Sequence, residues 1–148
     1  MADNTLQLCS FKLAEALFGL NTMLVQEIIK VPEITKVYQA PTEIVGIINL
    51  RGKIVTIIDL AIKLDLPTTV ETKNRRIIIV ESANEPFGLM VDYINDVIEI
   101  DGDELGTAPA NVRSSQGRFI SGVFRDEDQL IAVLNLEEIV NQPEKKVD

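Results

Sequence analysis

The amino-acid sequence predicts a mainly β fold of two small barrels or curled sheets, each with about five short strands. Runs rich in Ile, Val and Phe recur along the chain between turn residues, a pattern typical of strands. The order of these runs is repeated in the second half of the chain. Helix is expected to be minor, confined to short segments that follow an Asp or an Asn.

The clearest strand pair covers residues 44–60, which read IVGIINLRGKIVTIIDL. Two β-branched runs flank the basic tip Arg51-Gly52-Lys53, so we expect a β-hairpin. The carboxylate of Asp59 can accept hydrogen bonds from the free amides of a helical turn over residues 60–64. This stretch is therefore predicted to form a hairpin, a cap and a short helix.

A weaker copy of the hairpin occurs later in the chain. Gly122 precedes Asn135 by thirteen positions, just as Gly46 precedes Asp59. The second pair lies 76 residues after the first. Asn135 is the predicted cap of a last helix, with Glu138 at the spacing of a capping box and residues 142–143 at its end. The chain therefore carries an internal duplication.

A second pair of blocks repeats with a different offset. Residues 18–20 and 25–29 recur as 87–89 and 94–98, an offset of 69. Because the two offsets differ by seven (76 − 69), the second half holds seven extra residues within 99–118. We expect this insertion to be a polar loop.

Further strands are expected in both halves at residues 6–13, 18–20, 25–31, 34–37, 76–81, 87–92 and 94–100. Near Cys9 and Ser10 the alternation of apolar and polar residues changes phase, which indicates a bulge in the first of these strands. Residues 1–148 are expected to form one domain with two lobes, residues 6–64 and 75–142. A polar, Pro-marked linker at residues 65–74 joins the lobes.

Composition argues against several partners and locations. Fourteen Lys and Arg against 23 Asp and Glu give a net charge of −9, which would repel a nucleic-acid backbone. The charge is uneven, since residues 1–74 carry −1 (7 − 8) and residues 75–148 carry −8 (7 − 15). There is no apolar run of membrane-spanning length and no signal-peptide pattern at the start, so we expect a cytoplasmic protein without direct membrane insertion.

Catalytic chemistry is disfavoured. The chain has no His, no Gly-rich phosphate loop and one cysteine, Cys9, whose strand parity with Phe11 and Leu13 predicts a buried thiol. A hydrolase would need a nucleophile that these residues do not supply. A carboxylate pair of Glu27 and Asp59 could serve acid–base chemistry, but Asp59 is already expected to be a cap.

A metal site is also disfavoured. The acidic run at residues 101–104 invites a calcium interpretation, but an EF-hand loop needs oxygen ligands where Leu105 and Val112 stand. A solvated loop is the better interpretation, and neither a metal nor a cofactor is expected.

The two hairpin tips differ in charge although their frame is repeated. The first tip is basic at Arg51 and Lys53, whereas Arg125 in the second is followed by three carboxylates at residues 126–128. Opposite charges at matching positions predict different partners, as in an adaptor with more than one binding surface. A general ligand-binding β-barrel module is the alternative from another class.

The block VQEI at residues 25–28 and the block GIINLRGKIV at residues 46–55, followed by Ile58-Asp59-Leu60, resemble the CheW-type coupling proteins of bacterial chemotaxis. The resemblance covers about residues 6–140. It implies two tandem five-stranded SH3-like barrels and a non-enzymatic adaptor that couples chemoreceptor cytoplasmic tips to the histidine kinase CheA. A coupler of a parallel pathway, such as surface motility, is the alternative within the family. The implied location is the cytoplasm, with recruitment to membrane receptor arrays.

The resemblance also implies binding residues. Those for the receptor are Val25, Glu27, Arg51 and Val97, and those for the regulatory domain of CheA are Leu105 and Pro109, in the loop at residues 103–111. On strand pattern alone, Val25 and Glu27 would be ordinary surface residues. Leu105 is expected to be an exposed contact whose substitution by Asp costs little stability.

Overall fold

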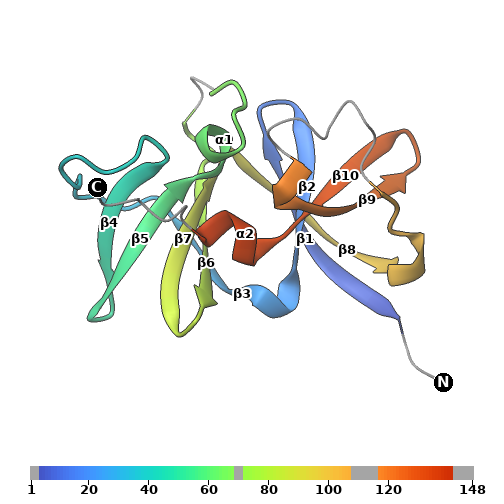
Figure 1. Ribbon diagram of the computed structural model, residues 1–148, viewed down its shortest axis with the longest axis horizontal. Helices are drawn as coiled ribbons and strands as arrows, with labels where there is room; N and C mark the ends of the chain where they lie inside the picture. Colours follow the sequence, from blue (N-terminus) through green and yellow to red (C-terminus); the bar gives the residue numbers. More distant parts are fainter. Residues whose placement is uncertain (1–3, 69–71, 108–116, 142–148) are drawn as a thin grey trace, which may run out of the picture.

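The computed structural model describes residues 4–68, 72–107 and 117–141. In this part of the chain, ten strands form two five-stranded sheets that lie side by side, and each is curled into a barrel (Figure 1). The predicted mainly β architecture of two five-stranded units is confirmed. No helix within the described ranges is both long and apolar enough to cross a membrane.

The first sheet has the order β8-β1-β2-β10-β9. Its strands are β1 (Thr5–Leu13), β2 (Ala16–Asn21), β8 (Tyr93–Asp101), β9 (Ile120–Asp126) and β10 (Gln129–Leu134). The second sheet has the order β3-β6-β7-β5-β4. Its strands are β3 (Val25–Lys30), β4 (Ile44–Leu50), β5 (Lys53–Asp59), β6 (Arg76–Ser82) and β7 (Glu85–Val91).

Short helices connect these strands: α1 (Leu60–Lys63), α2 (Leu136–Val140) and the 3₁₀ turns η1 (Thr22–Leu24), η2 (Gly102–Glu104) and η4 (Gly117–Phe119). The predicted caps are confirmed. The Asp59 carboxylate accepts from the amides of Ala61 and Ile62, and the Asn135 side chain accepts from the amide of Glu138. The last helix ends at Val140, and the predicted stop at residues 142–143 lies outside the described residues.

The composition of the sheets corrects the predicted lobes. Residues 6–64 and 75–142 do not each form one barrel, because β1 and β2 join β8, β9 and β10, while β3, β4 and β5 join β6 and β7. The reason lies in η1, a single 3₁₀ turn that leads β3 away from β2 instead of folding it back. Strand pattern shows which residues are extended, but it does not show which sheet they join.

The strand registers of the two barrels show the predicted duplication. β5 pairs in parallel with β7 at Thr56 and Phe87, and β10 pairs in parallel with β2 at the equivalent Ala132 and Phe18. A register shift does occur between Cys9 and Phe11, but the predicted bulge is in the wrong strand: the extra residue lies on β8, where Val97 and Ile94 are three positions apart. A matching shift occurs where β3 meets β6. Each half of the chain therefore gives its first two strands to one barrel and its last three to the other.

The two barrels share one hydrophobic core. Its largest cluster contains Phe11 from the first sheet, Ile78 from the second, and Leu60 and Leu136 from the two α-helices. Smaller clusters lie inside each barrel. Burial of this shared apolar surface holds the sheets together, because removing apolar area from water is the main favourable term in folding.

The predicted strand at residues 34–37 is wrong. Only an isolated bridge between Thr35 and Ile47 forms there, with Pro32 before it and Pro41 after it. Proline lacks an amide hydrogen and interrupts a ladder. The bridge closes the second barrel beside β4, and an equivalent bridge between Gly106 and Val123 closes the first.

Gly46 is required at the barrel closure. A Cβ at this position would lie 2.2 Å from the carbonyl oxygen of Thr35, closer than any real contact. Gly46→Ala is expected to lower the free energy of unfolding by about 2 kcal/mol or more, because the backbone must move apart there. The matched control is Gly106→Ala, whose Cβ would meet only the Val123 oxygen at 3.8 Å. Equal melting temperatures for the two variants would contradict this account.

Cys9 is buried as predicted, with 3% of its surface exposed, and burial raises the pKa of its thiol. Both effects disfavour attack by a thiol reagent, since the reactive species is the exposed thiolate. Labelling should therefore be slow in the folded protein and fast in denaturant. Equal rates under the two conditions would refute the buried assignment.

Candidate functional site

The Asn-Leu-Arg-Gly motif builds the tip of the β4–β5 hairpin. Leu50 pairs with Lys53, so Arg51 and Gly52 form a two-residue turn with φ values of 51° and 87°. Positive φ at both positions is the geometry of a type I′ turn. The Asn49 side chain accepts a hydrogen bond from the Gly52 amide at 2.9 Å. The motif thus fixes the turn and projects Arg51 outward, where 69% of its side chain is exposed.

Arg51 forms an ion pair with Glu27 of β3. Since β3 and β4 are the two edges of the sheet, barrel closure brings these residues together. An exposed pair contributes only about 0 to 1 kcal/mol to stability, so its main effect here is to orient the guanidinium. Two of the predicted receptor-binding residues therefore lie in one site.

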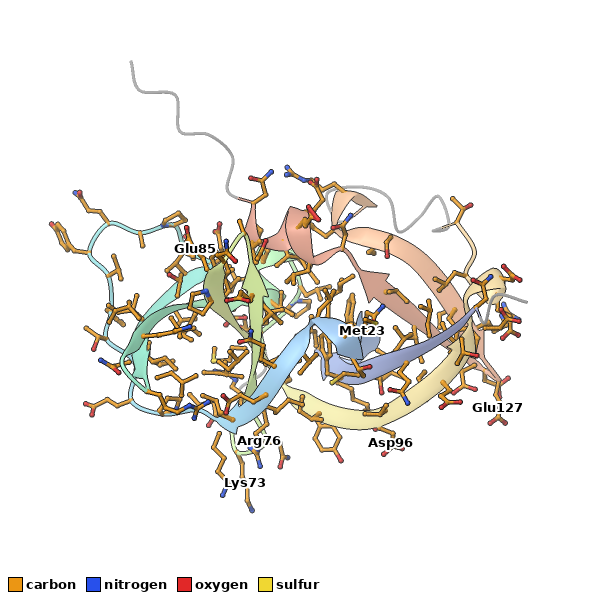
Figure 2. All side chains as sticks on the ribbon, turned by 90° about the horizontal axis from the view of Figure 1, so that it is seen from below. Met23, Lys73, Arg76, Glu85, Asp96 and Glu127 are labelled. Atoms are coloured by element: carbon orange, nitrogen blue, oxygen red, sulfur yellow. The ribbon has the colours of Figure 1, made fainter. Side chains whose placement is uncertain are left out.

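The equivalent positions on the other barrel cannot make such a pair. Asp96 stands 69 residues after Glu27, and Glu127 stands 76 residues after Arg51, so both carry negative charge. Glu127 keeps the positive backbone φ of Arg51, at 54°. Figure 2 shows Asp96 and Glu127 on one barrel and Lys73 and Arg76 on the other. The backbone of the hairpin tip is duplicated, but the ion pair of Arg51 with a carboxylate has no counterpart at the repeat positions.

Val25 is half-buried and packs against the shared core. The alternation predicted for β3 is confirmed, since Val25, Glu27 and Ile29 are half-buried while Gln26 and Lys30 are exposed. Val25 therefore packs against the core and also keeps part of its surface exposed, so its contact with the receptor stays a prediction.

Val97 lies on β8, in the other sheet, and is 60% exposed. Its counterpart in the repeat, 69 residues earlier, is Ile28, which is 41% exposed on β3. Sequence reasoning named Val97 but missed Ile28, although the offset of 69 could have found it. Two apolar side chains are thus exposed at matching positions of the two barrels.

The predicted kinase-binding loop is only partly described. Pro109 lies outside the described residues, whereas Leu105 follows η2. Leu105 is half-buried and packs against the cluster of Leu8, Ile100 and Val133. The expected exposure is wrong for Leu105, because the adjacent Gly106–Val123 bridge holds the chain against the barrel. Its contact with the kinase stays a prediction.

The acidic run before Leu105 has a structural role. The Asp101 side chain accepts a hydrogen bond from the amide of Asp103. The Glu104 side chain accepts one from the amide of Asp101, and the two bonds form a capping box. Within the described ranges, no group of three or more metal-ligating side chains is present. These carboxylates stabilise a turn.

The proposed acid–base pair of Glu27 and Asp59 is not supported. Glu27 binds Arg51, while Asp59 is buried and caps α1. Burial raises the pKa of the Asp59 carboxyl, and its hydrogen bonds to the Ile62 and Ala61 amides oppose that rise only in part. The two carboxylates serve separate structural purposes.

The CheW-like domain family matches residues 7–144, nearly the whole chain. The chain belongs to the CheW-like domain family. It is 29% identical over 146 residues to the chemotaxis protein CheW of Treponema pallidum, covering 96% of this chain and 86% of that protein. To the chemotaxis protein CheW of Bacillus subtilis it is 30% identical over 125 residues, covering 84% of this chain and 80% of that protein.

A solved structure gives the same answer for the fold. The crystal structure of the scaffolding protein TtCheW from Thermoanaerobacter tengcongensis matches with a TM-score of 0.86 and 35% identity, over 93% of this chain and 88% of that chain. The predicted pair of five-stranded SH3-like barrels, the fold of CheW-like domains, is confirmed.

The half-buried position of Leu105 leads to a prediction for this CheW-like domain. Leu105→Asp is expected to lower the free energy of unfolding by about 1 to 3 kcal/mol, because a carboxylate would replace apolar packing. Thermal unfolding measures the loss, and Thr107→Asp, at an exposed neighbour, is the matched control. A variant as stable as the control would restore Leu105 as an exposed contact.

Proposed function

We propose that this chain is a non-enzymatic adaptor that couples the cytoplasmic tips of chemoreceptors to the histidine kinase CheA. The observation that carries the proposal is the Asn-Leu-Arg-Gly hairpin, which presents Arg51 in an ion pair with Glu27 on a CheW-like fold. An exposed guanidinium with fixed orientation suits recognition of carboxylates or backbone carbonyls. The named relatives, which are chemotaxis proteins, support this kind of partner.

The receptor side of the proposal rests on residues from both barrels. Arg51 and Glu27 provide a polar contact, and exposed Ile28 and Val97 provide apolar area on β3 and β8. Interfaces typically combine a few such anchors with a polar rim. Val25, half-buried on β3, is the remaining proposed receptor contact.

The kinase side rests on the loop that begins at Leu105. Its start is fixed to the first barrel by hydrogen bonds between Gly106 and Val123, at 2.8 and 2.9 Å. A loop held on a rigid scaffold is a common place for binding residues. Under this proposal the protein acts in the cytoplasm and is recruited to membrane receptor arrays.

A pull-down from lysate with the purified chain tests the proposal. Recovery of chemoreceptors together with CheA is the expected result. Recovery of the receptors and kinase of another chemosensory pathway, such as one for surface motility, would assign the chain to that pathway instead. Recovery of a small ligand alone would favour a ligand-binding module and overturn the adaptor function.

Arg51→Glu gives a sharper prediction. The reversal would remove the contact of the guanidinium and oppose charge to the receptor, which costs roughly 2 to 5 kcal/mol at a desolvated interface. Receptor affinity should fall by about 30-fold or more, at about 1.4 kcal/mol per tenfold. The melting temperature should hardly move, because the pair with Glu27 is exposed.

A charge swap separates receptor contact from intramolecular pairing. The double variant Glu27→Arg with Arg51→Glu can restore the ion pair while leaving the guanidinium in the wrong place. It should bind receptor as weakly as the single variant, measured by calorimetry. If the folded Arg51→Glu variant binds the receptor with unchanged affinity, Arg51 is not a receptor contact.

A further inference from the structure

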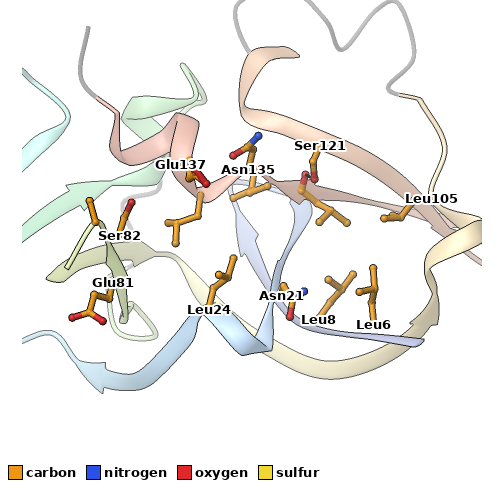
Figure 3. A pocket seen from close by; sticks show the side chains of 14 residues that line it. Leu6, Leu8, Asn21, Leu24, Glu81, Ser82, Leu105, Ser121, Asn135 and Glu137 are labelled. Atoms are coloured by element: carbon orange, nitrogen blue, oxygen red, sulfur yellow. Dashed lines mark hydrogen bonds between the residues drawn. The ribbon is translucent and has the colours of Figure 1, made fainter. Parts of the chain in front are cut away.

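Two surface grooves occupy equivalent places on the two barrels. The larger has a volume of about 630 Å³ and is bordered by β1, η1, the β6–β7 hairpin and α2 (Figure 3). The smaller has a volume of about 400 Å³ and lies beside α1 and β4. Four residues lining the larger groove match four lining the smaller at the repeat offsets of 69 or 76: Leu6 with Arg75, Asn21 with Met90, Ser121 with Val45, and Asn135 with Asp59.

The chemistry of the larger groove changes along its length. Figure 3 shows Leu6, Leu8 and Leu105 at one end, and Glu81 and Glu137 at the other. Leu24, which is 38% exposed, lies between them. No Lys or Arg is among the described residues that line this groove.

Its acidic end continues into a neighbouring groove of about 550 Å³, which shares Glu137 and adds Glu85 and Glu138. Glu138 has a partner in Arg118, at 3.2 Å. Within the described ranges, by contrast, no ion pair neutralises Glu81, Glu85 or Glu137. Carboxylates of like charge gathered without a cation raise the affinity of a surface for positive groups.

We propose that the larger groove binds a short segment of a partner protein in which apolar side chains are followed by Lys or Arg. The apolar side chains would cover Leu6, Leu24 and Leu105, and the cations would lie between Glu81 and Glu137. Several lining residues are exposed, including Ala83 and Ser121, so the groove is open and suits a peptide better than an enclosed small molecule.

The equivalent groove on the other barrel provides the contrast. Its lining includes Lys36 and Arg75, and Arg75 stands at the repeat position of Leu6. These two cations outnumber the one carboxylate in its lining, Asp59, so a cationic segment would meet an excess of like charge there. The duplicated groove has therefore diverged, and only its acidic copy fits the proposed ligand. This inference names the chemistry of a segment and does not depend on the proposed receptor or kinase.

The test uses a fluorescein-labelled peptide with a leucine-rich half and a lysine-rich half, and a matched peptide in which glutamates replace the lysines. Fluorescence anisotropy should show binding of the first peptide and not of the second. In the NMR spectrum of the ¹⁵N-labelled protein, the amide chemical shifts that change on binding should centre on Leu24, Ser82 and Glu137. Binding of neither peptide, or shifts centred on Lys36 and Arg75, would overturn the proposal.

Protein variants separate the groove from general attraction to an acidic protein. The double variant Glu81→Gln with Glu137→Gln should weaken binding by about tenfold, and Leu24→Ser by a similar factor. The control is Glu127→Gln with Asp128→Asn, which removes the same charge at the β9–β10 tip and should change affinity less than about twofold. Thermal unfolding checks that each variant is folded. An equal loss in the control would mean that net charge alone attracts the peptide, which would overturn the site.

Discussion

Each barrel depends on a parallel pairing between strands from different halves of the chain: β5 with β7, and β10 with β2. The remaining pairs are antiparallel. An isolated hairpin such as β1–β2 or β6–β7 is marginal in water, because it buries too little apolar surface. Only the exchanged strands complete each barrel and enclose its apolar face. The two halves must therefore fold together, and the core that they share reflects this exchange.

The candidate site depends on the same constraint. Since β3 leaves β2 and joins the sheet of β4 and β5, barrel closure places Glu27 against Arg51 across 24 residues of sequence. If the first half had folded back on itself, β3 would have lain beside β1 or β2. The ion pair is thus a product of topology. The turn motif supplies only the outward direction of the Arg51 side chain.

Sequence predicted the local structure well, for identifiable reasons. The hairpin and the caps depend on near neighbours, so the turn residues, Asp59 and Asn135 were sufficient to locate them. The bulge opposite Ser10 was assigned to β1, whereas its extra residue lies on the distant partner strand β8. Sheet membership depends on pairing between distant strands, and a duplicated pattern fits either exchanged or unexchanged pairing equally. For this reason the lobe boundaries at residues 64 and 75 were wrong although the repeat itself was right. Leu105 was misjudged because the bridge that anchors it is formed by a backbone pair that leaves no mark on side-chain pattern.

The exchange also sharpens the charge difference between the barrels. Residues 25–91, which supply all strands of the second barrel, carry 8 basic and 8 acidic side chains, a net charge of 0 (8 − 8). The remaining residues carry 6 and 15, a net charge of −9 (6 − 15), which is the whole net charge of the chain. The difference in net charge between the two halves of the sequence, −1 against −8, is smaller than this difference between the barrels. Two similar barrels, one formed by a neutral part of the chain and one by a strongly acidic part, present different electrostatic fields at equivalent surfaces, which favours different partners. Under the proposed adaptor function, this divergence of charge would let two similar barrels bind separate partners.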